Sequence, residues 1–205
     1  MGRPAKFDRR DMAGAALRLV AERGPRALTV AALAKEIGAP TGSIYHRYES
    51  REQLLAELWM EVVEAFQEAF VAELERATDL EGAVRAARFM AEWTRAHPLE
   101  ARLLLLHRRQ DFVAGPWPEA LVARAAALEP RMGAALRGFG KRAFGRADAD
   151  VMLRLRYALL DAPFGGLKPY VQSGKPTPAL FEELVEATVR GVLGAIPWQG
   201  ERSPR

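Results

Sequence analysis

The sequence of 205 residues contains no cysteine, so disulfide bonds and thiolate metal sites are both excluded. This absence is compatible with a reducing environment, and we expect the protein to be cytoplasmic. No apolar run approaches the roughly 20 residues of a membrane span, and the N-terminus lacks the apolar core of a secretion signal. We therefore expect no role in a membrane. A chain of this length can bury a substantial core.

Motifs of common enzymes are missing as well. The sequence has no G-x-x-x-x-G-K-S/T, H-E-x-x-H or G-x-S-x-G, and its three histidines form no recognised metal set. Residues 138–143, GFGKRA, match a dinucleotide-binding fingerprint, but they follow a helical pattern and no βαβ pattern surrounds them. We interpret them as a basic helix end and loop. An enzyme, a metal site and a bound cofactor are therefore not expected.

The most informative segment is Leu28 to Leu55, which reads as two short helices around a tight turn and the start of a long helix. Thr29 can cap the first of these helices with its hydroxyl. Gly38 can end it in a left-handed conformation, and Pro40 can open the next helix at its first turn. Apolar residues recur between these signals at helical spacing: Val30, Leu33, Ala34 and Ile37.

The second short helix, near Thr41 to His46, has an outer face with no Lys, Arg, Asp or Glu. Ile44 and Tyr48 are four residues apart and can hold its inner face to the core. Small and polar side chains remain on the outer face, which favours close approach to the DNA major groove: Pro40, Thr41, Ser43, Tyr45 and His46.

The net charge lies at the same end of the chain. Residues 1–55 hold ten Lys or Arg and six Asp or Glu, a net charge of +4 that equals the net charge of the whole sequence. The remaining 150 residues carry twenty charges of each sign. This placement, more than the modest size of the excess, favours a nucleic-acid partner.

This N-terminal block resembles the tetracycline-repressor (TetR) family of bacterial transcription regulators, over about the first quarter of the chain. The matching segments are Ala15-Ala16-Leu17, Ala21-Glu22-Arg23-Gly24, Leu28-Thr29-Val30, Ile37-Gly38, Gly42-Ser43-Ile44-Tyr45-His46-Arg47-Tyr48 and Ser50-Arg51-Glu52-Gln53-Leu54-Leu55. The resemblance implies a homodimeric repressor that binds a pseudo-palindromic operator in double-stranded DNA and is released by a small-molecule effector. The choice of a repressor over an activator rests on the resemblance alone.

Roles in DNA binding can be assigned to the matching residues as hypotheses. Thr41, Ser43 and His46 are placed for base edges or nearby phosphates, while Gly42 permits close approach of the backbone. Tyr45 and Thr29 are assigned to phosphate, and Tyr48 to the core. Three basic residues complete the set: Arg51, which resembles the family's phosphate-binding Lys, and Arg3 and Lys6 of a basic arm. For Arg51 and Lys6 the alternative is a solvated surface charge.

We expect an all-α protein, with a helix-turn-helix DNA-binding domain over residues 1–50, a helical effector-binding and dimerisation domain over 51–199, and a tail over 200–205. A Pro/Gly-rich connection, Pro163 to Pro178, should join the last two long helices. The expected helices are Asp8 to Arg23, the two short helices, Ser50 to Arg76, Leu80 to Ala96, Leu99 to Arg109, Glu119 to Phe139, Asp148 to Ala162 and Thr177 to Ile196.

The last of these helices carries an apolar stripe wider than packing on one neighbour needs. We therefore expect a two-fold dimer interface formed by Leu160, Phe164, Phe181, Leu184, Val185, Thr188, Val189 and Val192. The alternative is that these residues are the core of a monomer.

The middle helices contain residues that could line an effector pocket: Phe89, Trp93, His97, His107, Phe112, Trp117, Tyr157 and Phe164. Aromatic residues at helical spacing are more often ordinary core, and His97 before Pro98 could simply end a helix. The effector itself is not identified by the sequence. A helical scaffold that binds only protein is the remaining alternative, and it would leave the outer face of the second short helix unused.

Overall fold

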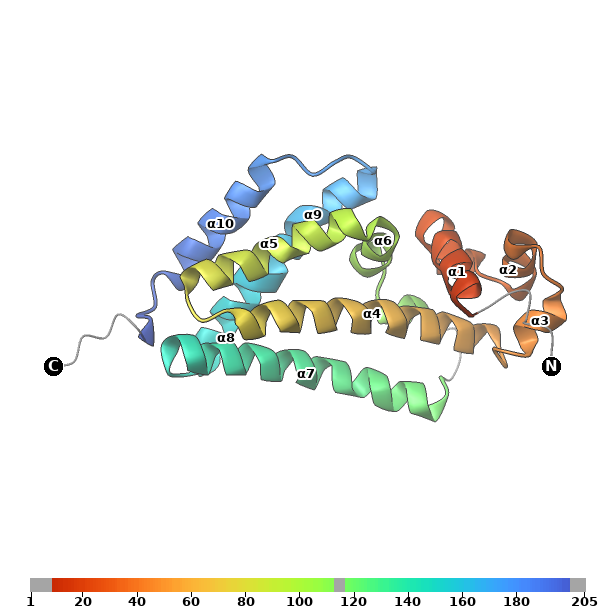
Figure 1. The fold of residues 1–205 in the computed structure, drawn as a ribbon, viewed down its shortest axis with the longest axis horizontal. Coiled ribbons are helices and arrows are strands. Elements are labelled where there is room, and N and C mark those ends of the chain that lie inside the picture. Colours follow the sequence, from red (N-terminus) through yellow and green to blue (C-terminus); the bar gives the residue numbers. More distant parts are fainter. Residues whose placement is uncertain (1–8, 113–116, 200–205) are drawn as a thin grey trace, which may run out of the picture. The chain divides into compact units, whose positions relative to one another are not determined.

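The structure is a computed structural model that describes residues 9–112 and 117–199, and every regular element in these ranges is helical (Figure 1). The elements are α1 (Arg9–Arg23), η1 (Pro25–Ala27), α2 (Val30–Ile37), α3 (Thr41–Tyr45), α4 (Arg51–Arg76), α5 (Leu80–Ala96), α6 (Pro98–Leu106), η2 (Arg109–Phe112), α7 (Glu119–Phe144), α8 (Ala149–Arg156), η3 (Tyr157–Asp161), α9 (Ala162–Ser173) and α10 (Leu180–Leu193). The expected all-α class is confirmed. Each helix in the described ranges is too short or too polar to cross a membrane.

The chain folds into two compact units. The first comprises residues up to 63 together with 99–125, and the second comprises residues 64–98 together with those from 126 onward. In the first unit, α1 packs on η1 and α2, and α2 packs on α3. Its core contains Met12, Leu33, Ile44, Leu54 and Leu55, each at most 1% exposed. Three short helices therefore share one apolar centre with the start of α4.

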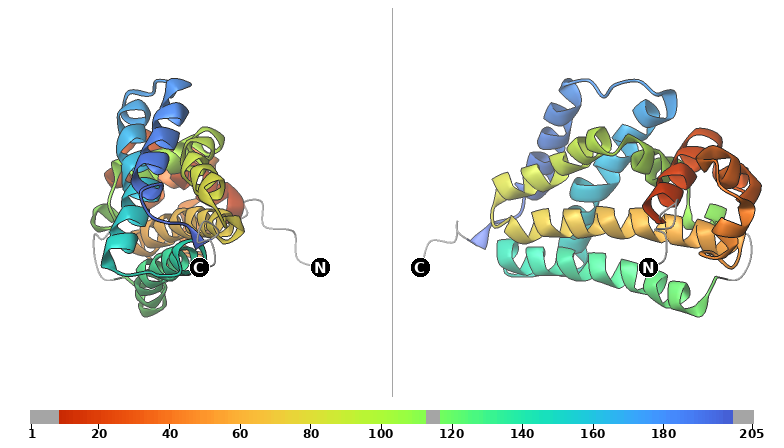
Figure 2. Two further views of the ribbon diagram at one scale, coloured as in Figure 1. Left: turned by 90° about the vertical axis from the view of Figure 1, so that its left-hand side faces the viewer. Right: turned by 45° about the vertical axis from the view of Figure 1, so that its right-hand side comes forward.

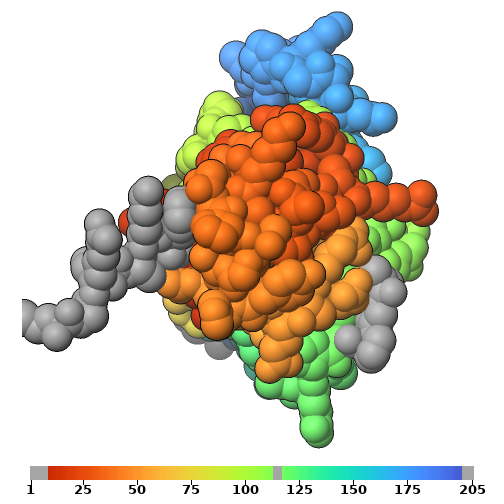
Figure 3. Space-filling model, turned by 90° about the vertical axis from the view of Figure 1, so that its right-hand side faces the viewer, coloured from red at the N-terminus to blue at the C-terminus, as the bar shows by residue number. Residues whose placement is uncertain are grey.

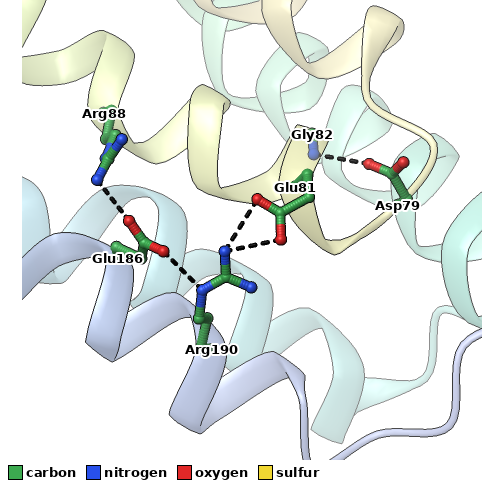
Figure 4. Close-up of polar contacts among 6 residues, drawn as sticks. All are labelled: Asp79, Glu81, Gly82, Arg88, Glu186 and Arg190. Atoms are coloured by element: carbon green, nitrogen blue, oxygen red, sulfur yellow. Dashed lines mark hydrogen bonds and ion pairs between the residues drawn. The ribbon is translucent and has the colours of Figure 1, made fainter. Parts of the chain in front are cut away.

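In the second unit, α5 packs along α10 and also contacts η3 and α9 (Figure 2). A ladder of ion pairs runs along the antiparallel α5–α10 contact. Arg190 bridges Glu81 and Glu186 at 2.7 Å each, and Glu186 also pairs with Arg88 (Figure 4). The pair Arg95–Glu182, also 2.7 Å, extends the ladder. Asp79 caps the start of α5 by accepting the Gly82 N–H at 2.7 Å. We refer below to the four ion pairs, Arg190–Glu81, Arg190–Glu186, Arg88–Glu186 and Arg95–Glu182, as the ion ladder.

The expected connection from Pro163 to Pro178 is wrong over most of its length, because α9 occupies residues up to Ser173. Upstream, η3 is a π-helical turn in which the Ala162 N–H donates to the Tyr157 carbonyl, five residues back. Pro163 then stands at the start of α9, directly after this irregular turn in an uninterrupted helical run. The helix ends only at Gly174, whose φ of 68° is the left-handed conformation of a helix terminator.

Other boundaries differ by less. The helix expected to end at Phe139 continues to Phe144 as α7, with Pro130 inside it. The helix expected over Leu99 to Arg109 is α6 followed by the 3₁₀ turn η2. The last helix is shorter than expected, and covers only Leu180–Leu193.

Candidate nucleic-acid interface

The first half of the predicted helix-turn-helix forms as its sequence indicates. The Oγ1 of Thr29 accepts the Ala32 N–H at 3.0 Å, which caps α2. Gly38 ends α2 with φ of 65°, and the next residue, Ala39, donates its N–H to the Ala34 carbonyl at 2.9 Å. The turn between the two short helices is therefore closed by local hydrogen bonds.

Pro40 precedes α3 instead of lying in its first turn. It is extended (φ −62°, ψ 141°), and its carbonyl accepts the Ser43 N–H at 3.0 Å. The locked φ of proline fits this flanking position as well as a helical one, and only ψ distinguishes them. As a result α3 begins at Thr41, one residue later than a proline in the first turn would place it.

The two faces of α3 divide as expected. Ile44 is fully buried and Tyr48 is 3% exposed, so both anchor the inner face. Burial, with the nearby carboxylate of Glu57, raises the pKa of the Tyr48 phenol above its ordinary value of 10.0. The outer face contains one large exposed aromatic side chain, Tyr45, at 57% exposure. Thr41, Gly42 and His46 are also exposed, and Ser43 is half-buried.

The first unit also exposes much of its basic charge. Arg10, Arg18 and Arg23 of α1 reach solvent, as do Arg26, Lys35 and Arg47. Figure 3 shows the face on which the red to orange segments α1 to α3 lie together. Arg3 and Lys6, which were assigned to the DNA backbone or minor groove, lie outside the described residues.

Arg51 is held by contacts within the protein. Its Nε donates to the Leu28 carbonyl at 2.5 Å, and its Nη2 donates to the Pro25 carbonyl at 3.0 Å. Only 26% of the side chain is exposed. The guanidinium therefore binds the backbone between α1 and α2, and is not a free surface charge.

These features belong to a known family. Residues 14–58 match the family described as bacterial regulatory proteins, tetR family. The matched span begins in α1, contains α2 and α3, and ends in α4. Residues 14–58 therefore form a tetR-family domain. No curated protein matches the sequence.

The chain as a whole is also similar to solved structures, over more than 90% of its length in each case below. The transcriptional regulator FadR of Bacillus subtilis, solved in complex with stearoyl-CoA, is 18% identical, with a TM-score of 0.67 over 91% of this chain and 98% of that one. PfmR of Thermus thermophilus is 22% identical, with a TM-score of 0.68 over 92% and 97%. The ketosteroid regulator KstR2 of Mycobacterium tuberculosis is 21% identical, with a TM-score of 0.63 over 94% and 96%. At these identities the similarity establishes the fold.

The candidate effector residues fall into separate groups. In the second unit, Phe66 is the centre of an aromatic cluster that includes Trp93 at 5.0 Å and Phe164 at 5.7 Å between ring centroids. Phe89 is 6.4 Å from Phe66, and the His97 ring is 5.0 Å from Trp93. Phe66 was not among the predicted residues, because its position on the long helix α4 looked like ordinary core.

The other candidates lie elsewhere. His107 packs edge-on against Phe112 in the first unit, at 6.1 Å, and Trp117 lies 6.0 Å from Trp59. Tyr157 is 51% exposed. A surface pocket of about 280 Å³ occurs in the second unit, and none of the predicted effector residues lines it. Its lining residues are Thr78, Asp79, Leu80, Glu81, Ala143, Trp198 and Gln199.

The predicted dimer residues divide between the interior and the surface of the second unit. Phe181, Val185 and Val189 are at most 7% exposed and belong to its core, so they present little area to a partner. Leu184 is 57% exposed, and Leu160, Phe164, Thr188 and Val192 are half-buried. Three other apolar side chains of the second unit are exposed: Leu153 at 67%, Tyr157 at 51% and Leu180 at 57%. Their exposure depends on how α8, η3 and α10 pack, which periodicity alone does not define.

Proposed function

We propose that this chain is a ligand-responsive transcriptional repressor, which binds a pseudo-palindromic operator as a homodimer and is released by a small molecule. The outer face of α3 is the observation that carries the proposal. Tyr45, Thr41 and His46 are exposed on a short helix whose inner face is anchored by Ile44. Short polar side chains allow the backbone to approach base edges closely, and the exposed Tyr45 hydroxyl can reach a phosphate.

The same segment supplies further contacts. Gly42 has open space around the position of a Cβ, so nothing in the protein obstructs the approach of DNA there. Ser43 follows Gly42, Pro40 is the N-cap of α3, and Thr29 is the N-cap of α2. We assign the base-edge contacts to Thr41, Ser43 and His46.

Homodimerisation is supported by apolar side chains exposed in the second unit. Leu180 and Leu184 lie on α10, four residues apart, and each is 57% exposed. Leu153 of α8 and Tyr157 of η3 are also exposed, and both elements contact α10. A group of large apolar side chains in water is typical of a protein–protein interface. One short helix reads few bases, and a two-fold dimer doubles the reading at half-sites about 34–36 Å apart or a multiple of it.

The effector is proposed to be apolar, because the second unit concentrates aromatic side chains around Phe66. Phe89 and Phe164 are half-buried members of this cluster. A ligand regulates only if it binds two states of the protein with different affinities. Stearoyl-CoA is a suitable first probe, since the FadR of Bacillus subtilis was solved with it.

Selection from a pool of random DNA duplexes tests this proposal. The wild-type protein is expected to enrich a palindromic sequence, and the purified duplex should then bind in a gel shift with two protomers per site. Tyr45→Phe removes only the hydroxyl and Tyr45→Ala removes the whole side chain. Both should weaken binding to all sequences alike if the hydroxyl contacts phosphate. Failure to enrich any duplex would contradict DNA recognition, and enrichment of single half-sites by a monomer would contradict the dimer.

Release by an effector needs its own measurement. Stearoyl-CoA is added to the complex of protein and enriched duplex, with free coenzyme A as the control that lacks the acyl chain. Dissociation by the acylated compound alone supports an apolar effector. Native mass spectrometry of the purified protein, which would identify a retained small molecule, is the alternative when neither compound acts.

A further inference from the structure

The hydrogen bonds of Arg51 connect the start of α4 to the backbone between α1 and α2. The Pro25 carbonyl accepts the N–H of Leu28 at 3.2 Å as well as the Nη2 of Arg51. The Leu28 carbonyl accepts the Nε of Arg51. The planar guanidinium therefore binds the first residue of η1, Pro25, through Nη2, and the C-cap of η1, Leu28, through Nε.

This turn directly precedes the DNA-reading helices. Leu28 is fully buried, and Thr29, the residue after it, is the N-cap of α2. The hydrogen-bonded turn at Gly38 then links α2 to α3. A shift of the Leu28 carbonyl would consequently move the start of α2, and α3 with it.

The surroundings of the guanidinium disfavour a DNA phosphate. Its Nη1 lies 3.7 Å from the carboxylate of Glu52, and most of the side chain is covered. A phosphate bound to Arg51 would lie near that carboxylate and would compete with two carbonyls that have no other guanidinium. Each charge-assisted hydrogen bond lost costs free energy, and the Pro25 carbonyl would keep only the Leu28 N–H.

We propose that Arg51 is a positioning residue for DNA recognition, which fixes the α2–α3 pair through the carbonyls of Pro25 and Leu28 and does not bind phosphate. This inference rests on the proposed function, since it concerns how the reading helix is held. Lysine cannot replace the side chain, because one ammonium group lacks the planar pair of donors that reaches both carbonyls. Binding should therefore depend on the shape of the group and not on its charge.

Arg51→Lys and Arg51→Ala test the proposal, with binding measured at several salt concentrations to the duplex that wild type enriches and to an unrelated duplex. Both variants are expected to lose about tenfold or more in affinity for the enriched duplex, because fewer molecules hold the binding geometry. Affinity for the unrelated duplex and the salt slope should stay as in wild type. A phosphate ligand behaves differently: Arg51→Lys would bind like wild type, and Arg51→Ala would lower the salt slope by about 0.9 on both duplexes. That result would overturn the proposal.

Arg26→Ala is the matched control, since Arg26 is an exposed arginine in the same turn. It removes one positive charge and leaves the two carbonyl contacts in place, so the ratio of the two affinities should not change. If Arg26→Ala lowers this ratio as much as Arg51→Ala does, while Arg51→Lys leaves it unchanged, the loss belongs to charge and the positioning role is wrong.

Hydrogen exchange of the free protein provides a measurement that does not need DNA. Arg51→Lys is expected to speed exchange at the amides of residues 26–33 and to leave α5 unchanged. Unchanged exchange at residues 26–33, or faster exchange throughout both units, would refute a local positioning role. If wild type enriches no duplex, the proposed function fails, and the exchange result still shows whether Arg51 holds this turn.

Discussion

Substitution by alanine is expected to stabilise the protein at Gly165 of α9 and to destabilise it at the neighbouring Gly166. At Gly165 an added Cβ meets nothing within 4 Å. At Gly166 it would lie 2.6 Å from Cε2 and 3.3 Å from Cζ of Phe181, whose ring is 7% exposed on α10. The absent side chain of Gly166 therefore makes room for the ring that joins α9 to α10.

The magnitudes follow from this difference. Replacing glycine by alanine inside an exposed helix gains roughly 0.5–1 kcal/mol, because the unfolded chain loses conformational freedom. Gly165→Ala should gain this amount. Gly166→Ala gains the same helix propensity but must displace a packed aromatic ring, and such overpacking costs about 1–3 kcal/mol. We therefore expect Gly166→Ala to be less stable than Gly165→Ala by about 1–3 kcal/mol.

Thermal unfolding followed by far-ultraviolet circular dichroism measures the difference. In a chain of this size each kcal/mol corresponds to about 2–4 °C, so the two variants should melt at least about 2 °C apart. In the Phe181→Leu background, where the ring is gone, Gly166→Ala should cost less stability than it does in the wild-type protein. The reasoning is refuted if Gly166→Ala is as stable as Gly165→Ala. If neither substitution has an effect, residues 165–166 are not in a helix.

Three further outcomes are expected. Leu184→Glu should weaken self-association at least about tenfold in analytical ultracentrifugation, because a carboxylate would be buried at the proposed dimer interface, and Leu184→Ala should have a smaller effect. Thr29→Ala should destabilise the first unit by about 1 kcal/mol in urea unfolding, whereas Thr29→Ser keeps the cap and the stability. Burial lowers the pKa of His107 below its ordinary value of 6.5. Stability should therefore be full above about pH 6.5 and fall as the pH drops toward the folded pKa, and His107→Gln should remove this dependence.

The helix-turn-helix could be predicted from sequence because its signals are local. Thr29, Gly38, Ile44 and Tyr48 each act through residues within a turn or two, and the structure confirms all four. The segment after Pro163 could not be predicted in this way. Proline and glycine usually mark loops, and here a π turn places Pro163 where a helix tolerates it, while the Phe181 ring occupies the space beside Gly166.

The role of Arg51 was beyond local reasoning for a different reason. Its partners, Pro25 and Leu28, are more than twenty residues away in sequence, and carbonyl groups carry no sequence signal. Arg102 shows the same limit, since its Nε donates to the Ala21 carbonyl at 2.9 Å. Side chains that bind the backbone can be found only once the fold is known.

The ion ladder has a consequence for the orientation of α10. One side of this helix is buried through Val185 and Val189, and a second side holds Glu186 and Arg190 against α5. Leu184 is left on the third side. Rotating α10 about its axis to hide this leucine would separate the ion pairs that join α10 to α5 and withdraw the valines from the core. The rotation of α10 about its own axis is therefore fixed, and Leu184 stays exposed to water in a single protomer.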